Sequence, residues 1–463
     1  MTPASVARFM ASLFPTGVTP ACRLLDAGAG VGALSCAFLD RCVTGDLRFK
    51  SIEVSAYEID PVLEHSLAEM MTPYREWLNL KTEVNANDFI EEAARLYQQG
   101  EGNFTHVIMN PPYRKIGSGS AHRLCLRSVG VETVNLYSAF AALAILLSAP
   151  GGQIVAIIPR SFCNGPYYKP FRKLILERTA IRHLHLFDSR SKAFKDDEVL
   201  QENLIVRLEC GARPSAVTVS TSTDDTFTDL AVHAYDFDQI VFPGDSERFI
   251  HVPTSPEHGT LDQWAGARST LAELSIGVST GPVVDFRMRE FLRDAPAADT
   301  VPLLYPGHFT SVGTEWPKPA LKKPDAIVCN SDTAKWLFST GSYCVVRRFS
   351  AKEERRRIVA SVVSPETFGD APKLGFENHL NVFHANKKGL PKALAHGLAA
   401  YLNTTAVDNY FRRFNGHTQV NATDLKQMLY PSRAALIDIG EWVIKQDGVA
   451  QHALDEMVAA LVA

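Results

Sequence analysis

The sequence predicts an α/β protein built on a mostly parallel sheet. Up to about residue 210, short apolar runs alternate with stretches of helical length and pattern. The first of these runs ends in a glycine-rich turn, and polar residues directly follow several later runs. Alternating strands and helices are typical of parallel sheets, whose functional loops lie at the carboxyl ends of the strands. We therefore expect the ligand site to be built from these loops.

The strands are predicted from short apolar runs that stop at glycine, proline or polar residues. They are expected at Arg23–Ala27, Ser51–Tyr57, Phe104–Met109, Gln153–Ile158, Arg182–Phe187 and Asn203–Leu208. Helices are expected between them, and the one at Tyr137–Ser148 is so apolar that it must be buried. The other expected helices lie near Gly32–Cys42 and from about Asp60 to Leu80.

The second half of the chain has a different pattern. Past about residue 212 the alternation is lost, Ser and Thr gather at Thr218–Thr226, and Pro and Gly recur. We expect helices at about Leu390–Leu402, with Pro391 in the first turn, and at about Ser432–Leu461. At roughly 100–200 residues per domain, two or three domains are expected. One boundary near residue 245 would give an α/β domain at 1–245 and an α+β domain at 246–463.

The composition is that of a globular protein, 46% hydrophobic and 21% charged. Eight cysteines stand singly, without metal-clip spacing, which indicates reduced thiols and a cytoplasmic location. His183 and His185 alternate along one strand without further ligands at suitable spacing, so we expect no metal. The chain shows no signal-peptide pattern and no apolar run near the roughly 20 residues of a membrane span. A net charge of −4 neither indicates nor excludes a nucleic-acid partner.

A glycine-rich turn at Asp26–Gly32 follows the first strand and opens a helix. Its Gly-x-Gly-x-Gly spacing departs from the pyrophosphate fingerprint and favours a nucleoside cofactor without a phosphate. Glu58 ends the second strand, where an acid can accept hydrogen bonds from ribose hydroxyls. Asp88 and Phe89 follow the third strand, where the acid can bind an adenine amino group and the ring can cover the base. Taken alone, such a turn is also compatible with a structural role or an NAD site.

The expected strand at Phe104–Met109 is the fourth, after the one that precedes Asp88, and Asn110-Pro111-Pro112-Tyr113 directly follows it. An aromatic or amide NH2 is a poor nucleophile because its lone pair is delocalised. Two acceptors, the Asn110 side-chain oxygen and the Pro111 carbonyl, would hold its hydrogens and shift the nitrogen towards tetrahedral geometry. The prolines restrict the backbone, and Tyr113 offers a face on which a planar group can stack. The motif therefore predicts methyl transfer to an amino group, carried by positioning and electrostatics.

With these motifs in this order, the chain resembles the amino-methylating methyltransferases that depend on S-adenosylmethionine. More narrowly, it is similar to the γ-class adenine-N6 DNA methyltransferases of restriction–modification systems, the BsuBI/PstI-like family. The resemblance implies a Rossmann-like class I methyltransferase domain with a mostly parallel, seven-stranded sheet. It further implies a C-terminal target-recognition domain, in which Gly277–Arg287 and Phe414–Asn421 are similar to recurrent stretches of such domains.

The resemblance also implies a role for individual residues. Asn110, Pro111, Pro112 and Tyr113 correspond to the catalytic tetrapeptide, and Phe194 to an aromatic that stacks with Tyr113 on the flipped target base. Thr2 and Pro3 correspond to a cofactor motif that precedes the glycine turn in this class. The complete expected cofactor set is Thr2, Pro3, Asp26, Ala27, Gly28, Gly30, Glu58, Ile59, Asp88, Phe89 and Asn110.

Double-stranded DNA is the expected partner, together with a separate cognate restriction endonuclease, and we expect a monomer. Basic residues gather in two stretches, which can be either solvated surface or DNA contacts. We expect phosphate contacts from Arg114, Lys115, Arg347, Arg348 and Arg355, extending to Arg357. The other stretch holds Lys169, Arg172, Lys173, Arg178, Arg182, Arg190, Lys192 and Lys195.

Other functions remain open at this level. The same tetrapeptide serves methylation of ribosomal-RNA amino groups and of protein glutamine. The long stretch after the catalytic half favours DNA, because those enzymes usually place their extra domain at the N-terminus. A subunit that only recognises DNA is a further alternative, which the intact motifs disfavour.

Overall fold

The structure is a computed structural model that describes residues 2–16, 20–187, 202–254, 266–310, 313–351, 353–416, 418–446 and 448–462. Contacts divide the chain into two units, Met1–Pro256 and Glu257–Ala463. Each unit is described by itself.

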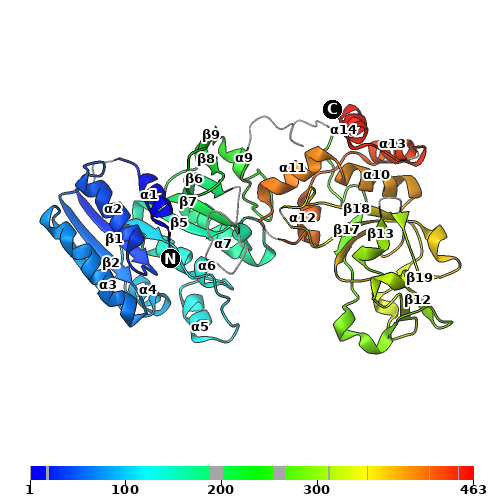
Figure 1. Ribbon diagram of the computed structural model, residues 1–463, viewed down its shortest axis with the longest axis horizontal. Helices are drawn as coiled ribbons and strands as arrows, with labels where there is room; N and C mark the ends of the chain where they lie inside the picture. The colour runs from blue at the N-terminus through cyan, green and yellow to red at the C-terminus, as the bar shows by residue number, and fades with distance from the viewer. Residues whose placement is uncertain are drawn as a thin grey trace. The chain divides into compact units, whose positions relative to one another are not determined.

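The first unit is a three-layer α/β/α structure (Figure 1). Its strands are β1 (Ala21–Ala27), β2 (Ser51–Tyr57), β3 (Leu80–Asn85), β4 (Phe104–Met109), β5 (Ser148–Pro159), β6 (Thr179–Phe187), β7 (Asn203–Cys210), β8 (Val217–Ser222) and β9 (Ala231–Tyr235). Its helices are α1 (Ala4–Ser12), α2 (Ala33–Val43), α3 (Pro61–Met71), α4 (Phe89–Gln98), α5 (Ala121–Ser128), α6 (Leu136–Leu147), α7 (Lys169–Arg178) and α9 (Phe237–Ile240).

The strands form one sheet in the order β3-β2-β1-β4-β5-β7-β6-β8-β9. Most run parallel, and β7 is antiparallel to both β5 and β6. Because side chains alternate along a strand, each strand contributes to two apolar cores. Helices α4, α6 and α7 share one core, and α1, α2 and α3 share the other. The predicted Rossmann-like, mostly parallel α/β sheet is confirmed, and the described residues place nine strands in it where seven were expected.

Of the last two strands, β8 comes from the Ser- and Thr-rich segment that broke the predicted pattern, and β9 follows that segment. In the structure, Ser220 of β8 lies 2.8 Å from Nδ1 of His185 and 2.7 Å from Nε2 of His183, both on β6. These polar side chains satisfy one another inside the sheet, so the strand needs no apolar run. Burial lowers the pKa of His185 to about 3 and that of His183 to about 4, which leaves both rings neutral near pH 7.

Two predicted helices are shorter than expected. The helix expected from Asp60 to about Leu80 ends at Met71, and a 3-10 segment at Thr72–Glu76 leads into β3. Pro73 explains the break, because proline has no N–H to continue an α-helix. The stretch expected at 432–461 is two helices, α13 (Arg433–Ile444) and α14 (Gln451–Val462), separated by a turn where Gly448 has a φ of 85°.

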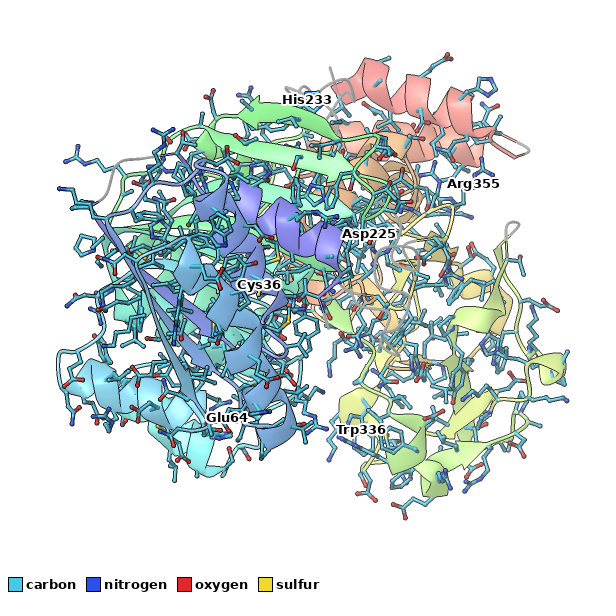
Figure 2. All side chains as sticks on the ribbon, turned by 60° about the vertical axis from the view of Figure 1, so that its left-hand side comes forward. Cys36, Glu64, Asp225, His233, Trp336 and Arg355 are labelled. Carbon is cyan, nitrogen blue, oxygen red and sulfur yellow. The ribbon has the colours of Figure 1, made fainter. Side chains whose placement is uncertain are left out.

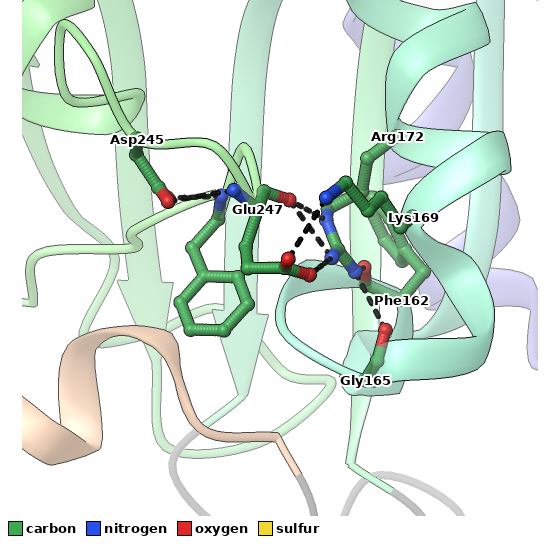
Figure 3. Close-up of polar contacts among 7 residues, drawn as sticks. Phe162, Gly165, Lys169, Arg172, Asp245 and Glu247 are labelled. Atoms are coloured by element: carbon green, nitrogen blue, oxygen red, sulfur yellow. Dashed lines mark hydrogen bonds and ion pairs between the residues drawn. The ribbon is translucent and has the colours of Figure 1, made fainter. Parts of the chain in front are cut away.

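The contacts end the first unit at Pro256, close to the predicted boundary near 245. Arg172 of α7 is fully buried and donates to the carbonyl oxygen of Glu247 from Nε at 3.0 Å and from Nη2 at 2.9 Å (Figure 3). The same guanidinium donates to the carbonyls of Phe162 and Gly165. The backbone of Ile250 then donates to Cys163 at 3.0 Å. Residues just past 245 are therefore part of the first unit's hydrogen-bond network.

The second unit combines small sheets with C-terminal helices, as the predicted α+β class requires. One sheet has the order β10-β20-β17-β18 and another β11-β15-β12-β19-β16, while β13 and β14 form a hairpin. The strands are β10 (Gly277–Thr280), β11 (Leu292–Arg293), β12 (Thr300–Leu304), β13 (Phe309–Thr310), β14 (Gly313–Thr314), β15 (Ala326–Val328), β16 (Phe338–Ser339), β17 (Tyr343–Arg347), β18 (Ala360–Val363), β19 (Lys373–Phe376) and β20 (Leu380–His384). Besides α13 and α14, the helices are α10 (Lys392–Leu402), α11 (Thr405–Phe414) and α12 (Ala422–Gln427).

Candidate functional site

The carboxyl ends of four neighbouring strands, β3, β2, β1 and β4, surround a cavity of about 440 Å³. From β1, the strands β2 and β3 follow on one side of the sheet, and β4 and β5 follow on the other. The switch point therefore lies between β1 and β4, and ligands of open α/β sheets bind at such a point. The volume suits a small molecule. The cavity is lined by Gly28, Tyr57, Glu58, Ile59, Asn87, Asp88, Phe89, Ile90, Asn110, Pro112, Arg114, His122, Leu136 and Phe140.

The glycine turn is tied to the end of β2. The backbone N–H groups of Gly28 and Ala29 donate to the Tyr57 carbonyl at 3.0 and 2.9 Å, and Gly30 donates to Oε2 of Glu58 at 2.8 Å. Gly28 has a φ of 78°, and a Cβ added there would face the Asn110 carbonyl at 3.9 Å. Glycine at this position therefore keeps the space between the turn and the end of β4 open.

Asp26 lies at the end of β1 beneath the turn and is completely buried. Its Oδ2 accepts a hydrogen bond from Ser35 at 2.7 Å, whereas its Oδ1 has no partner within the described chain. Burial raises the pKa of the Asp26 carboxyl to about 7, although the hydrogen bond from Ser35 opposes this change. This oxygen lies beneath the glycine turn, and Asp26 is not among the residues that line the cavity.

Asp88 and Phe89 begin α4, on the β3 side of the cavity. Oδ1 of Asp88 caps the helix by accepting from the N–H of Ile90 at 2.9 Å and of Glu91 at 3.2 Å. The other oxygen, Oδ2, lies 3.0 Å from Nε2 of His122 on α5. The Phe89 ring packs against Phe140 with its centroid 4.9 Å away. Ile59, on the neighbouring loop, leaves 65% of its side chain exposed, which suits an apolar contact with a planar ligand.

The Asn110 side chain is held at both ends. Its Nδ2 donates to the Thr2 hydroxyl at 3.0 Å, and its Oδ1 accepts from the Tyr113 hydroxyl at 2.9 Å. The Tyr113 hydroxyl also lies 3.2 Å from the Ile157 carbonyl on β5. Both partners of the amide are hydroxyl groups, which can donate or accept, so the two contacts hold the Asn110 side chain in place in either orientation of the amide. The predicted roles of Thr2 and Asn110 thus converge on one hydrogen-bonded pair.

Several cavity residues were not anticipated from the sequence. Tyr57 and Asn87 adjoin predicted site residues, and Ile90 begins the helix that Asp88 caps. Phe140 and Leu136 belong to α6, whose side chains are mostly apolar, so the pattern distinguishes neither of them. His122 had no signal at all, because its partner Asp88 is 34 positions earlier. Of the other predicted residues, Ala27 is buried at the end of β1 and Pro3 caps α1.

The structure separates the predicted DNA-binding residues into different groups. Arg114 lines the cavity and Lys115 beside it is exposed, both in the first unit. Arg347, Arg348 and Arg355 lie in the second unit, and Arg355 is exposed at its surface (Figure 2). Phe194, like Arg190, Lys192 and Lys195, lies outside the described residues.

Two of the basic residues expected at the surface are buried. Arg357 is 1% exposed, and its Nε donates to Ser350 at 3.1 Å and its Nη2 to Oδ1 of Asn415 at 2.8 Å. Arg172 is buried by the contacts with Glu247, Phe162 and Gly165 described above. The expectation of a phosphate contact from Arg357 is therefore wrong, because its guanidinium already serves internal oxygens.

Among the described residues, no group of three or more His, Cys, Asp or Glu side chains is arranged to hold a metal ion. The helices in the described ranges are all too short or too polar to cross a membrane.

Comparison with known proteins identifies relatives along nearly the whole chain. The chain is 50% identical to the type II methyltransferase M.BsuBI of Bacillus subtilis, over 99% of this chain and 93% of that protein. It is 41% identical to the type II methyltransferase M.PstI of Providencia stuartii, over 96% of this chain and 88% of that protein. Residues 47–194 match the Eco57I restriction-modification methylase family. Among solved structures, a DrdV–DNA complex is similar with a TM-score of 0.51 and 11% identity, covering 96% of this chain and 56% of that one.

Proposed function

Because the chain belongs to the family of type II methyltransferases that includes M.BsuBI and M.PstI, we propose that it methylates the N6 amino group of adenine in duplex DNA. The observation that carries this proposal is the Asn110 amide, which Thr2 and Tyr113 hold at the edge of the cavity beside the glycine turn. The protein acts at a specific sequence, as the modification enzyme of a restriction–modification system, and has S-adenosylmethionine as its cofactor.

The residues around the cavity fit this cofactor. Glu58 lines the cavity and has lone pairs left for ribose hydroxyls after binding the N–H groups of Gly30 and Asp60, whereas Asp26 lies beneath the glycine turn. An adenine ring would find a hydrogen-bond acceptor in Asp88 and apolar surfaces in Phe89 and Ile59. When bound, S-adenosylmethionine supplies an electrophilic methyl group. No metal is required for this chemistry.

The chain's own residues prepare the nucleophile. Oδ1 of Asn110 has two lone pairs, so it can accept one hydrogen from the target amino group while Tyr113 occupies the other. The Pro111 carbonyl would accept the second hydrogen, and both contacts would draw the nitrogen towards tetrahedral geometry. Asn110 cannot act as a base, so the methylated nitrogen loses its surplus proton to solvent. Positioning of the amino group supplies most of the rate enhancement.

The adenine must leave the duplex to reach this position, because a paired and stacked N6 cannot enter a cavity. Unstacking costs a few kcal/mol, and stacking on an aromatic ring recovers about 1–3 kcal/mol per base. Tyr113, together with Phe194, would provide that stacking. The second unit would select the sequence, and Arg114 and Lys115 would contact phosphates near the extruded nucleotide. We further propose a monomer that works in the cytoplasm beside a separate cognate endonuclease.

The test is expression of the full chain in a host without adenine methylation, followed by long-read sequencing that detects modified bases. The expected result is N6-methyladenine at one short sequence motif. Asn110→Ala is the matched control, and it should lose at least about 100-fold in turnover, as removal of a transition-state contact does, while still binding the cofactor. Methylation of ribosomal RNA or protein in place of DNA would refute the proposal.

A further inference from the structure

A hollow of about 280 Å³ lies within the second unit and belongs to no site described above. It is lined by Pro306, Arg347, Phe349 and His379. Phe349 leaves 42% of its side chain exposed, although aromatic side chains are usually buried. The His379 ring packs beside it with centroids 5.0 Å apart. The hollow therefore combines one cation, one exposed aromatic ring and one imidazole.

The two segments similar to recurrent stretches of target-recognition domains both support this hollow. In the first, a Cβ at Gly281 would lie only 2.2 Å from the Glu377 carbonyl, so only glycine allows the close approach. Val283 then exchanges backbone hydrogen bonds with Phe376 and Asn378, next to His379.

In the second segment, the Val420 N–H donates to the Arg348 carbonyl at 2.7 Å, and Ser350 donates to the Thr418 carbonyl at 3.0 Å. These bonds fix the backbone on both sides of Phe349. Both segments thus bond the backbone directly beside residues that line the hollow, the first beside His379 and the second beside Phe349.

Buried and half-buried acids orient the polar residues of the hollow. Glu377 is fully buried, and its Oε1 lies 2.6 Å from Nδ1 of His379. Its Oε2 accepts the backbone N–H of His379 at 2.9 Å. Glu354 forms an ion pair with Nη2 of Arg347 and accepts the Ala351 N–H at 2.9 Å. The guanidinium is therefore held in one orientation with donors left over, since it carries five N–H groups.

We propose that this hollow reads a guanine of the DNA target, with Arg347 donating to N7 and O6 on its major-groove edge. This inference rests on the proposed function. Paired acceptors on one base edge match a guanidinium, and this pairing is the commonest specific contact of arginine with DNA. A phosphate is the other ligand with this chemistry. Glu354 disfavours it, because a carboxylate that partly neutralises Arg347 repels an anion, and the walls formed by Phe349 and Pro306 are apolar.

The experiment uses the full-length protein and the target motif obtained by sequencing. Each guanine of the motif is replaced in turn by 7-deazaguanine, which loses the N7 acceptor and keeps base pairing. We expect kcat/KM of the wild type to fall about tenfold or more at one guanine, as loss of a specific base contact does. Arg347→Ala should methylate more slowly and should show no further loss at that guanine. Arg289→Ala, which removes an exposed cation of the second unit that has no predicted DNA contact, should keep the wild-type response.

Arg347→Lys distinguishes a guanine from a phosphate as the ligand of the hollow, because lysine keeps the positive charge and loses the paired donors. If Arg347 contacts a base, Arg347→Lys loses the difference between guanine and 7-deazaguanine at the same position as Arg347→Ala does. Arg347→Lys also provides the test if Arg347→Ala fails to fold. Wild-type selectivity in Arg347→Lys, an equal loss on all sequences in Arg347→Ala, or a motif without guanine overturns the inference. Absence of any methylated adenine with the wild type would instead refute the proposed function itself.

Discussion

Thr2 and Asn110 are 108 positions apart in sequence, yet the Thr2 hydroxyl accepts a hydrogen bond from the Asn110 amide at 3.0 Å. The contact places the segment before α1 against the loop after β4. The Tyr113 hydroxyl contacts the other end of the same amide at 2.9 Å, so two hydroxyl groups hold the Asn110 side chain. We therefore expect Thr2 to act through Asn110 as a positioning residue.

The first prediction concerns this pair. Thr2→Ala should lower kcat about 3- to 10-fold, the range expected for one lost hydrogen bond, because only the Tyr113 hydroxyl then holds the Asn110 amide. Thr2→Ser keeps the hydroxyl and should restore kcat to near the wild-type value. Single-turnover methylation of duplex DNA measures the effect, and calorimetry with S-adenosylmethionine serves as control. Equal kcat values for Thr2→Ala and Thr2→Ser would show that the hydroxyl does not position Asn110.

Tyr113 should contribute to base flipping through its ring and to Asn110 through its hydroxyl. Tyr113→Phe keeps the ring and should lose only the hydrogen bond of the hydroxyl to Asn110. Tyr113→Ala should lose this hydrogen bond and the stacking of the flipped base. A duplex with 2-aminopurine at the target position reports extrusion by its fluorescence, and a mismatch at that position should tighten binding by lowering the flipping cost. Identical fluorescence for all three proteins, with no effect of the mismatch, would contradict stacking of the flipped base on Tyr113.

Glu58 and Asp88 should bind the cofactor without contributing to DNA affinity. Glu58→Gln and Asp88→Asn each remove a negative charge, and each should weaken S-adenosylmethionine binding by roughly 1.5–3 kcal/mol, the value of a charge-assisted hydrogen bond. Asparagine can still cap α4 through its side-chain oxygen, so Asp88→Asn separates cofactor binding from helix stability. Calorimetry measures the affinity of each variant for S-adenosylmethionine and for duplex DNA. Unchanged cofactor affinity in both variants would refute the assignment of the site.

Asp26 predicts a particular dependence of stability on pH. Burial raises the pKa of its carboxyl in the folded protein to about 7, from an ordinary value of 3.8. Between these two values the folded state holds a proton that the unfolded state lacks, so the contribution of Asp26 to stability falls as the pH rises from about 4 to about 7. Asp26→Asn stays neutral, so its stability relative to the wild type should increase over this range and level off above it.

The measurement for Asp26 is the free energy of unfolding in urea at several pH values for both proteins. Ser35→Ala provides a useful control, since Ser35 donates to Asp26 and its loss should shift the transition to higher pH. A difference between wild type and Asp26→Asn that does not vary with pH would show that the carboxyl titrates normally.

The extent of the first unit can be tested by truncation. A chain of residues 1–256 should fold and bind the cofactor, but should not methylate a specific sequence. A chain of residues 1–245 should melt about 5 °C or more below it, because the buried Arg172 guanidinium loses the Glu247 carbonyl and an unsatisfied buried group costs about 1–3 kcal/mol. Thermal unfolding of the two fragments measures this difference, and equal melting temperatures would place the end of the unit at 245.

The sequence alone determined the features that depend on neighbouring residues. Strand periodicity located β1, β2 and β4, and the glycine turn, Glu58, Asp88 and the Asn110–Tyr113 motif followed directly from residues at strand ends. Carboxyl ends of parallel strands meet at one edge, so local signals at those ends were sufficient to predict which of them share a cavity.

Only the tertiary structure decided which polar side chains satisfy one another. Ser220 with His185, Arg357 with Asn415, and Thr2 with Asn110 are contacts between distant parts of the chain. The Ser- and Thr-rich strand β8 and the buried Arg357 were misjudged for this reason, since composition does not show whether a polar group has an internal partner. The hollow at Arg347 also exists only because distant segments converge on it, and a stretch of basic residues does not distinguish an arginine that faces a ligand from one that is already bound inside the protein.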